Sequence, residues 1–175
     1  HMLGHEGSAT ILEIGPGVTR FKKDDVVVLT WIKSSGADVP QTQYKNGKQV
    51  VNAGGVTTFS ECAVVSENRC VHLPEGIPLD IASLFGCAVL TGAGIVTNTI
   101  QPDSKNSLAV FGLGGIGLSA LMAAGLYECQ TLIAVDIEQD KLDLASEFGA
   151  THLINSSSEN PVERIREITG GAGVD

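Results

Sequence analysis

The clearest pattern of hydrophobic positions lies between residues 107 and 136. Two runs of apolar, largely β-forming residues, Leu108–Phe111 and Leu132–Val135, flank a glycine-rich segment and a stretch with apolar residues at helical spacing. The second run ends on Asp136. This order of strand, glycine loop, helix, strand and terminal acid predicts one parallel βαβ unit.

The pattern continues beyond this unit with two further helices and one strand. A helical pattern stops at Gly149, and a third strand is expected at residues 151–154. Asn160 and Pro161 then have the residue types of an N-cap and a first helical position, so a last helix should begin there. The expected architecture is α/β, with part of a doubly wound parallel sheet.

Residues 3–100 have a different pattern, which predicts a β-rich module followed by connecting helices. Four short apolar runs are expected to be strands, at residues 8–14, 26–29, 57–65 and 70–73. The polar segment 34–55 predicts a long surface excursion. Two helices are expected at 80–85 and 87–100, the second buried between the modules. We therefore place the domain boundary between residues 100 and 101.

Composition and charge narrow the classes of partner. The chain has 175 residues and 43% hydrophobic residues, and its net charge of −9 argues against a nucleic-acid partner. No apolar run reaches the roughly 18 residues of a membrane span, so we expect no membrane partner. The cysteines form no CxxC pair or disulfide framework, which favours a cytoplasmic location. They are Cys62, Cys70, Cys87 and Cys129.

The loop between the first strand and helix of the βαβ unit has GxGxxG spacing. Gly112 permits a tight turn, Gly114 a close approach of a pyrophosphate, and Gly117 close packing of helix on strand. Gly115 and Ile116 lie at the helix start, where free N–H groups favour phosphate. These residues predict a dinucleotide site. The alternative is a βαβ unit whose glycines serve turns alone.

Asp136 lies 19 residues after Gly117, at the end of the second strand. Its carboxylate is placed to accept hydrogen bonds from both ribose hydroxyls of an adenosine. Because it would repel a 2′-phosphate, it favours NAD over NADP. The alternative is an acid that caps the following helix.

Two other segments carry candidate metal ligands. His5 and Glu6 stand directly before a predicted strand, and Cys87 stands at a predicted helix start. Histidine nitrogen and cysteine sulfur are typical zinc ligands. A separation of 82 residues between His5 and Cys87 carries no information by itself. The alternatives are a structural histidine and a buried core cysteine.

Taken together, these segments resemble the zinc-dependent medium-chain alcohol dehydrogenases. The similarity rests on Gly-His-Glu-Gly before a strand, the segment Leu84–Gly92, the glycine loop, and Asp136 followed by Lys141. It implies that residues 3–100 form a partial GroES-like catalytic domain with connector helices. Residues 101–175 would then be the first half of an NAD-binding Rossmann domain.

The resemblance also implies roles for individual residues. His5 and Cys87 would bind a catalytic zinc ion, with Glu6 as the acidic neighbour behind it, and Thr91 would contact the nicotinamide. The residues expected to hold the adenosine diphosphate are Gly112, Gly114, Gly115, Ile116, Gly117, Asp136 and Lys141. The implied reaction transfers a hydride between an alcohol and NAD, giving an aldehyde or ketone, while zinc polarises the substrate oxygen.

Some features of the family have no counterpart in this sequence. The family's first zinc cysteine lies upstream of its Gly-His-Glu segment, and the four-cysteine structural zinc lobe is replaced here by a segment from Trp31 without cysteine. Cys62 and Cys70 are expected to be core residues on strands. We therefore expect an internal fragment of a longer enzyme, inactive and poor in zinc by itself, which forms a homo-oligomer through an exposed sheet edge. The alternatives are a zinc-free oxidoreductase of the quinone-reductase type and a non-catalytic nucleotide-binding or structural module.

Overall fold

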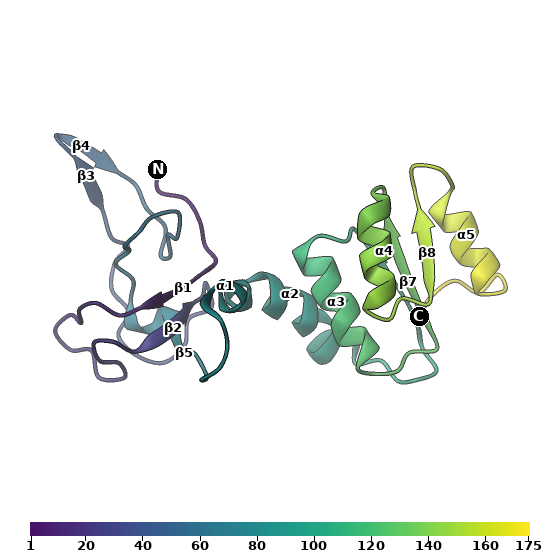
Figure 1. The fold of residues 1–175 in the computed structure, drawn as a ribbon, viewed down its shortest axis with the longest axis horizontal. Helices are drawn as coiled ribbons and strands as arrows, with labels where there is room; N and C mark the ends of the chain where they lie inside the picture. Colours follow the sequence, from purple (N-terminus) through teal and green to yellow (C-terminus); the bar gives the residue numbers. More distant parts are fainter. The chain divides into compact units, whose positions relative to one another are not determined.

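The computed structural model describes residues 1–175 and divides them into two compact units, 1–87 and 88–175 (Figure 1). The division falls after Cys87, whereas the sequence pattern had placed the helical segment 87–100 with the first part. In the structure Val96 of this segment is 2% exposed and belongs to the same core as Leu121 of the second unit.

The first unit is built on a three-stranded antiparallel sheet. Its strands are β1 (Gly7–Thr10), β2 (Val26–Leu29) and β5 (Cys70–His72), in the order β1-β2-β5. Ser8 pairs with Val28, which in turn pairs with Val71. Three of the four predicted strands are therefore confirmed, β2 with the predicted bounds and β1 and β5 with shorter ones. The small core beside this sheet consists of Phe21, Val27, Leu29, Val56 and Cys70.

The strand predicted at residues 57–65 was wrong. This segment forms no ladder, and the N–H groups of Thr58 and Phe59 instead donate to the carbonyl of Leu3. Cys62 within it is exposed, so its expected place in the core was also wrong, whereas Cys70 is buried on β5 as expected.

The polar excursion of residues 34–55 contains a β-hairpin that the pattern did not predict. Its strands are β3 (Tyr44–Asn46) and β4 (Gln49–Val51), which pair antiparallel. Gly47 in the connecting turn has a φ of 59°, a left-handed conformation that favours glycine.

Short helices lie on both sides of β5 in the sequence. In the first unit the 3-10 turn η1 (Glu67–Arg69) precedes β5, and α1 (Leu79–Ala82) continues into the 3-10 turn η2 (Ser83–Gly86). In the second unit α2 (Ala88–Gly94) continues into the π-helical segment η3 (Ile95–Ile100). No single helix is long and apolar enough to cross a membrane, and only Leu79–Gly86 and Ala88–Ile100 taken together match such a span in length and composition.

The second unit contains a three-stranded parallel sheet with helices on both faces. The strands are β6 (Ser107–Phe111), β7 (Thr131–Asp136) and β8 (His152–Asn155), in the order β6-β7-β8. The helices are α3 (Gly115–Gly125), α4 (Gln139–Glu147) and α5 (Pro161–Ile168). The α/β class and the partial doubly wound sheet are thus confirmed.

Alternate residues of β7 explain this layering. Leu132 and Ala134 belong to the core that contains Leu121 of α3 and Leu142 of α4, whereas Ile133 packs in a second cluster with Ile165 of α5. Because successive strand residues face opposite sides, the nearly continuous apolar run of β7 supplies both cores.

Candidate functional site

His5 and Glu6 are positioned by two glycines that press against one threonine. A Cβ at Gly4 would lie 2.5 Å from Oγ1 of Thr58, and a Cβ at Gly7 would lie 2.7 Å from Cγ2 of Thr58. Gly4 also has a φ of +87°. Larger residues at these two positions would push the segment away from Thr58, so the glycines determine where His5 and Glu6 lie.

Cys87 is positioned by a close contact between η2 and β2. A Cβ at Gly86 would lie only 2.2 Å from the carbonyl oxygen of Leu29, so glycine is required there. Nearby, the hydroxyl of Ser8 on β1 donates to the carbonyl of Leu79 on α1 at 2.5 Å. These contacts bring the end of η2 to the start of β1.

As a result His5, Glu6 and Cys87 lie together in the first unit. One possible ligand atom from each, a histidine nitrogen, a carboxylate oxygen and the cysteine Sγ, lie within 4.8 Å of one another. His5 is exposed, and Glu6 and Cys87 are half-buried. Ligand atoms of one tetrahedral zinc ion are separated by roughly 3.5 Å. Small side-chain rotations therefore suffice for this set to fit a zinc ion.

The glycine loop joins β6 to α3 in the second unit. Gly112 has a φ of +84°, and its N–H donates to the carbonyl of Val135 at 2.8 Å. A Cβ at Gly117 would lie 1.9 Å from the carbonyl oxygen of Gly112, whereas a Cβ at Gly114 would meet nothing within 4 Å. Gly114 is the N-cap of α3, and Gly115 and Ile116 begin the helix. The loop therefore leaves open space in front of the helix N-terminus.

Asp136 is bonded to this loop. Its Oδ2 accepts the N–H of Leu113 at 2.6 Å, and its Oδ1 accepts the N–H groups of Ile137 and Glu138 at 2.8 and 3.0 Å. These bonds, that of Leu113 first, hold the pKa of the Asp136 carboxyl below its usual range although burial opposes them. Nζ of Lys141 lies 3.7 Å from Oδ1, so a cation stands beside the acid.

The hydrogen bonds of Asp136 agree with the capping alternative, and one further bond joins it to the glycine loop. It caps the backbone that follows β7, and it holds the buried Leu113 in the middle of the glycine loop. The bond to Leu113 could not be foreseen from the sequence, because it joins residues 23 positions apart. Thr91 lies exposed on α2, in the same unit as the loop.

Comparisons with known proteins find two matching family profiles. Residues 1–75 match the alcohol dehydrogenase GroES-like domain, and residues 115–175 match the zinc-binding dehydrogenase domain. The chain belongs to the zinc-dependent medium-chain alcohol dehydrogenase family. Members of this family typically use NAD or NADP together with zinc.

Similarity to individual proteins of this family supports the same assignment. A probable alcohol dehydrogenase of a Pseudomonas species is 33% identical over 202 residues, covering 99% of this chain and 63% of the relative. An alcohol dehydrogenase zinc-binding domain protein from Burkholderia ambifaria has 35% identity and a TM-score of 0.78 over 99% of this chain and 54% of its own. Benzyl alcohol dehydrogenase from Acinetobacter calcoaceticus has 33% identity and a TM-score of 0.78 over 97% of this chain and 52% of its own. The chain thus spans about half to two thirds of the length of these relatives.

Proposed function

We propose that the chain is part of an enzyme that transfers a hydride between an alcohol and NAD, with zinc at the first unit and the nucleotide at the second. The observation that carries this proposal is the convergence of His5, Glu6 and Cys87 from distant parts of the sequence. A nitrogen and a sulfur donor with a carboxylate beside them match the donor types that catalytic zinc uses.

In this proposal residues of the first unit hold the metal ion and adjust the net charge around it. His5 offers a neutral ring nitrogen and Cys87 a thiolate, while the half-buried carboxylate of Glu6 adds negative charge beside them. A zinc ion held there would supply Lewis-acid chemistry, polarising a substrate oxygen and favouring its deprotonated form. Glu6 would reduce the net positive charge of the site and so adjust how strongly that oxygen is polarised.

The second unit would hold NAD, whose nicotinamide is the hydride acceptor. The N–H groups at the start of α3 would receive the pyrophosphate over Gly114, where no side chain fills the space. Asp136 would receive the adenosine ribose, with Lys141 at its side, and Thr91 would contact the nicotinamide. The depressed pKa of Asp136 keeps it ionised, which supports recognition of NAD over NADP.

Cobalt substitution tests the metal site without relying on activity. Cobalt bound through a thiolate gives a sulfur-to-metal charge-transfer band. Because the chain by itself is expected to hold little zinc, we expect this band when the wild-type chain is titrated with excess Co²⁺. Cys87→Ser should abolish the band, whereas Cys62→Ser should leave it unchanged because Cys62 is exposed and not part of the cluster. A band retained in Cys87→Ser would contradict the proposed ligand set.

Activity measurements then address the substrate. NADH formation would be followed with benzyl alcohol, because a structural relative is named for that substrate, and with a series of primary and secondary alcohols. Turnover that depends on added zinc and on Cys87 would support an alcohol dehydrogenase. Reduction of quinones in metal-free buffer with no loss in Cys87→Ser would instead favour the zinc-free alternative.

A further inference from the structure

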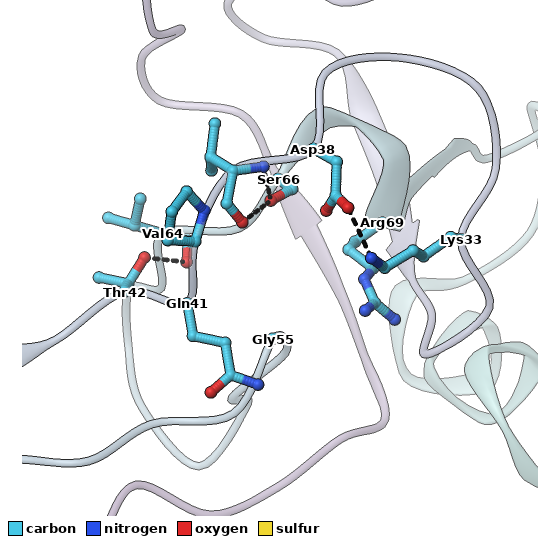
Figure 2. A pocket seen from close by; sticks show the side chains of 10 residues that line it. Lys33, Asp38, Gln41, Thr42, Gly55, Val64, Ser66 and Arg69 are labelled. Atoms are coloured by element: carbon cyan, nitrogen blue, oxygen red, sulfur yellow. Dashed lines mark hydrogen bonds and ion pairs between the residues drawn. The ribbon is translucent and has the colours of Figure 1, made fainter.

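A polar cavity of about 330 Å³ lies in the first unit, outside the proposed zinc cluster. It is lined by the polar excursion after β2 and by the segment before β5 (Figure 2). The cationic side chains of Lys33 and Arg69 line this cavity together with Asp38. In the figure these three side chains lie close together, and the amide end of Gln41 extends toward Gly55.

The guanidinium of Arg69 is held in a defined position. Its Nη1 donates to the carbonyl of Trp31, and its Cζ lies 5.6 Å from the centre of the Trp31 ring. A Cβ at Gly55 would lie 3.4 Å from Nη2 of Arg69, so the missing side chain there leaves room beside the guanidinium. Only Nη1 is engaged by Trp31, and the other N–H groups are available to a ligand.

The cavity carries one uncompensated positive charge. Nζ of Lys33 lies 2.5 Å from Oδ2 of Asp38, and this pair offsets one of the two cations. The hydrogen bond from Lys33 lowers the pKa of Asp38, so the carboxylate is ionised at neutral pH. Arg69 also interacts electrostatically with Asp38, so the two cations share one carboxylate and the cavity keeps one net positive charge in a chain whose net charge is −9.

The rest of the cavity wall is partly apolar, and the hydroxyl groups in it already form hydrogen bonds within the protein. The hydroxyl of Thr42 donates to the carbonyl of Val64 at 3.1 Å, and Ser66 exchanges hydrogen bonds with the backbone of Val39. These bonds join the two segments and leave Val39, Pro40 and Val64 as apolar surface. A ligand should therefore combine an anionic group with a small apolar body.

We propose that this cavity binds a small organic monocarboxylate. The two carboxylate oxygens would accept from the guanidinium of Arg69 in the bidentate geometry that this group favours, with Lys33 as a second donor. One excess positive charge matches one negative charge. A phosphate dianion would be repelled by Asp38 and would leave the apolar wall unused.

The test is a titration of this chain with sodium benzoate, followed through the ¹⁵Nε resonance of Arg69. Inorganic phosphate and sodium chloride at equal ionic strength are the comparisons. We expect a saturable shift with benzoate only. Lys33→Gln should weaken binding by about threefold to tenfold, the scale of one ordinary hydrogen bond.

Two further variants test the proposal, one with the opposite expected effect and one as a control. Asp38→Asn removes the competing carboxylate without removing a cation, so benzoate should bind about threefold to tenfold more tightly. Arg166→Gln, an exposed arginine on α5, should change nothing. A shift equal to that with chloride, tighter binding of phosphate, or equal affinities of wild type, Lys33→Gln and Asp38→Asn would each overturn the proposal.

Discussion

Two glycines of the nucleotide loop lack side chains for different physical reasons. At Gly117 a Cβ would lie 1.9 Å from the carbonyl oxygen of Gly112, a backbone atom fixed by its place at the end of β6. At Gly114 a Cβ would meet no protein atom within 4 Å. Gly117 is therefore needed by the fold itself, whereas Gly114 is needed only if a ligand approaches the loop.

These two positions give a matched pair of variants. Gly117→Ala should lower the free energy of unfolding by about 1–3 kcal/mol, because helix α3 must move away from the loop. Gly114→Ala should stay within about 0.5 kcal/mol of wild type yet weaken NAD binding. Urea unfolding and NAD titration of both variants check this. Equal stabilities of the two variants would contradict the assignment.

Glu67 predicts a pH dependence of stability. Its carboxylate accepts the N–H groups of Ala37, Arg20 and Thr19 at 2.7, 2.6 and 2.8 Å, and so joins two loops of the first unit. These bonds, that of Ala37 first, lower the pKa of Glu67 below its usual 4.5. A depressed pKa means stabilisation that is fully present above pH 4.5 and is lost as the pH falls through the folded-state pKa.

Glu67→Gln should therefore lower the urea midpoint at neutral pH and flatten its dependence on acid pH. The same measurement on Glu163→Gln, an exposed glutamate on α5, should follow the wild-type curve. Parallel pH profiles for wild type and Glu67→Gln would show that these hydrogen bonds do not depend on the charge.

At the scale of elements, the sequence predicts best where local pattern and burial coincide. Strands β6, β7 and β8 were predicted because both faces of a parallel sheet are covered, which produces short continuous apolar runs. Residues 57–65 also contain β-forming residues but find no ladder partner, since pairing depends on chain that is distant in sequence. The β3-β4 hairpin was missed because each of its strands has only three residues, although Gly47 at the first position of the two-residue turn is a known hairpin signal.

The candidate sites also differ in how far the sequence alone predicts them. The glycine loop is readable from the sequence because its residues are contiguous. His5 and Cys87 could be connected only through the resemblance to a family. The contacts that bring them together, Gly7 with Thr58 and Gly86 with Leu29, join residues more than fifty positions apart and leave no local pattern.

Helix α5 offers a prediction at the scale of one element. The side chain of Asn160 accepts the N–H groups of Val162 and Glu163, at 3.0 and 3.4 Å, as the N-cap pattern predicted. Asn160→Ala should lower the free energy of unfolding by about 1 kcal/mol, whereas Asn160→Asp should retain most of it. Urea unfolding followed by far-ultraviolet circular dichroism measures both. No loss in Asn160→Ala would mean that the cap contributes nothing.

At the scale of the whole molecule, the proposed chemistry is divided between the two units. The residues proposed for zinc all lie within residues 1–87, and the residues proposed for NAD all lie within residues 88–175. Each unit has its own core of buried residues. Binding of the metal and binding of the nucleotide should therefore respond to different substitutions.

A crossed pair of variants tests this separation. His5→Ala should abolish metal binding and any alcohol oxidation while leaving NAD affinity close to wild type, because the glycine loop is unchanged. Asp136→Ser should leave metal content unchanged and weaken NAD binding by about 1–3 kcal/mol, the scale of a lost hydrogen bond to a charged group. Metal analysis and NAD titration are made on both variants, with circular dichroism to verify folding. NAD affinity reduced equally by both substitutions would show that the two units do not bind their ligands independently.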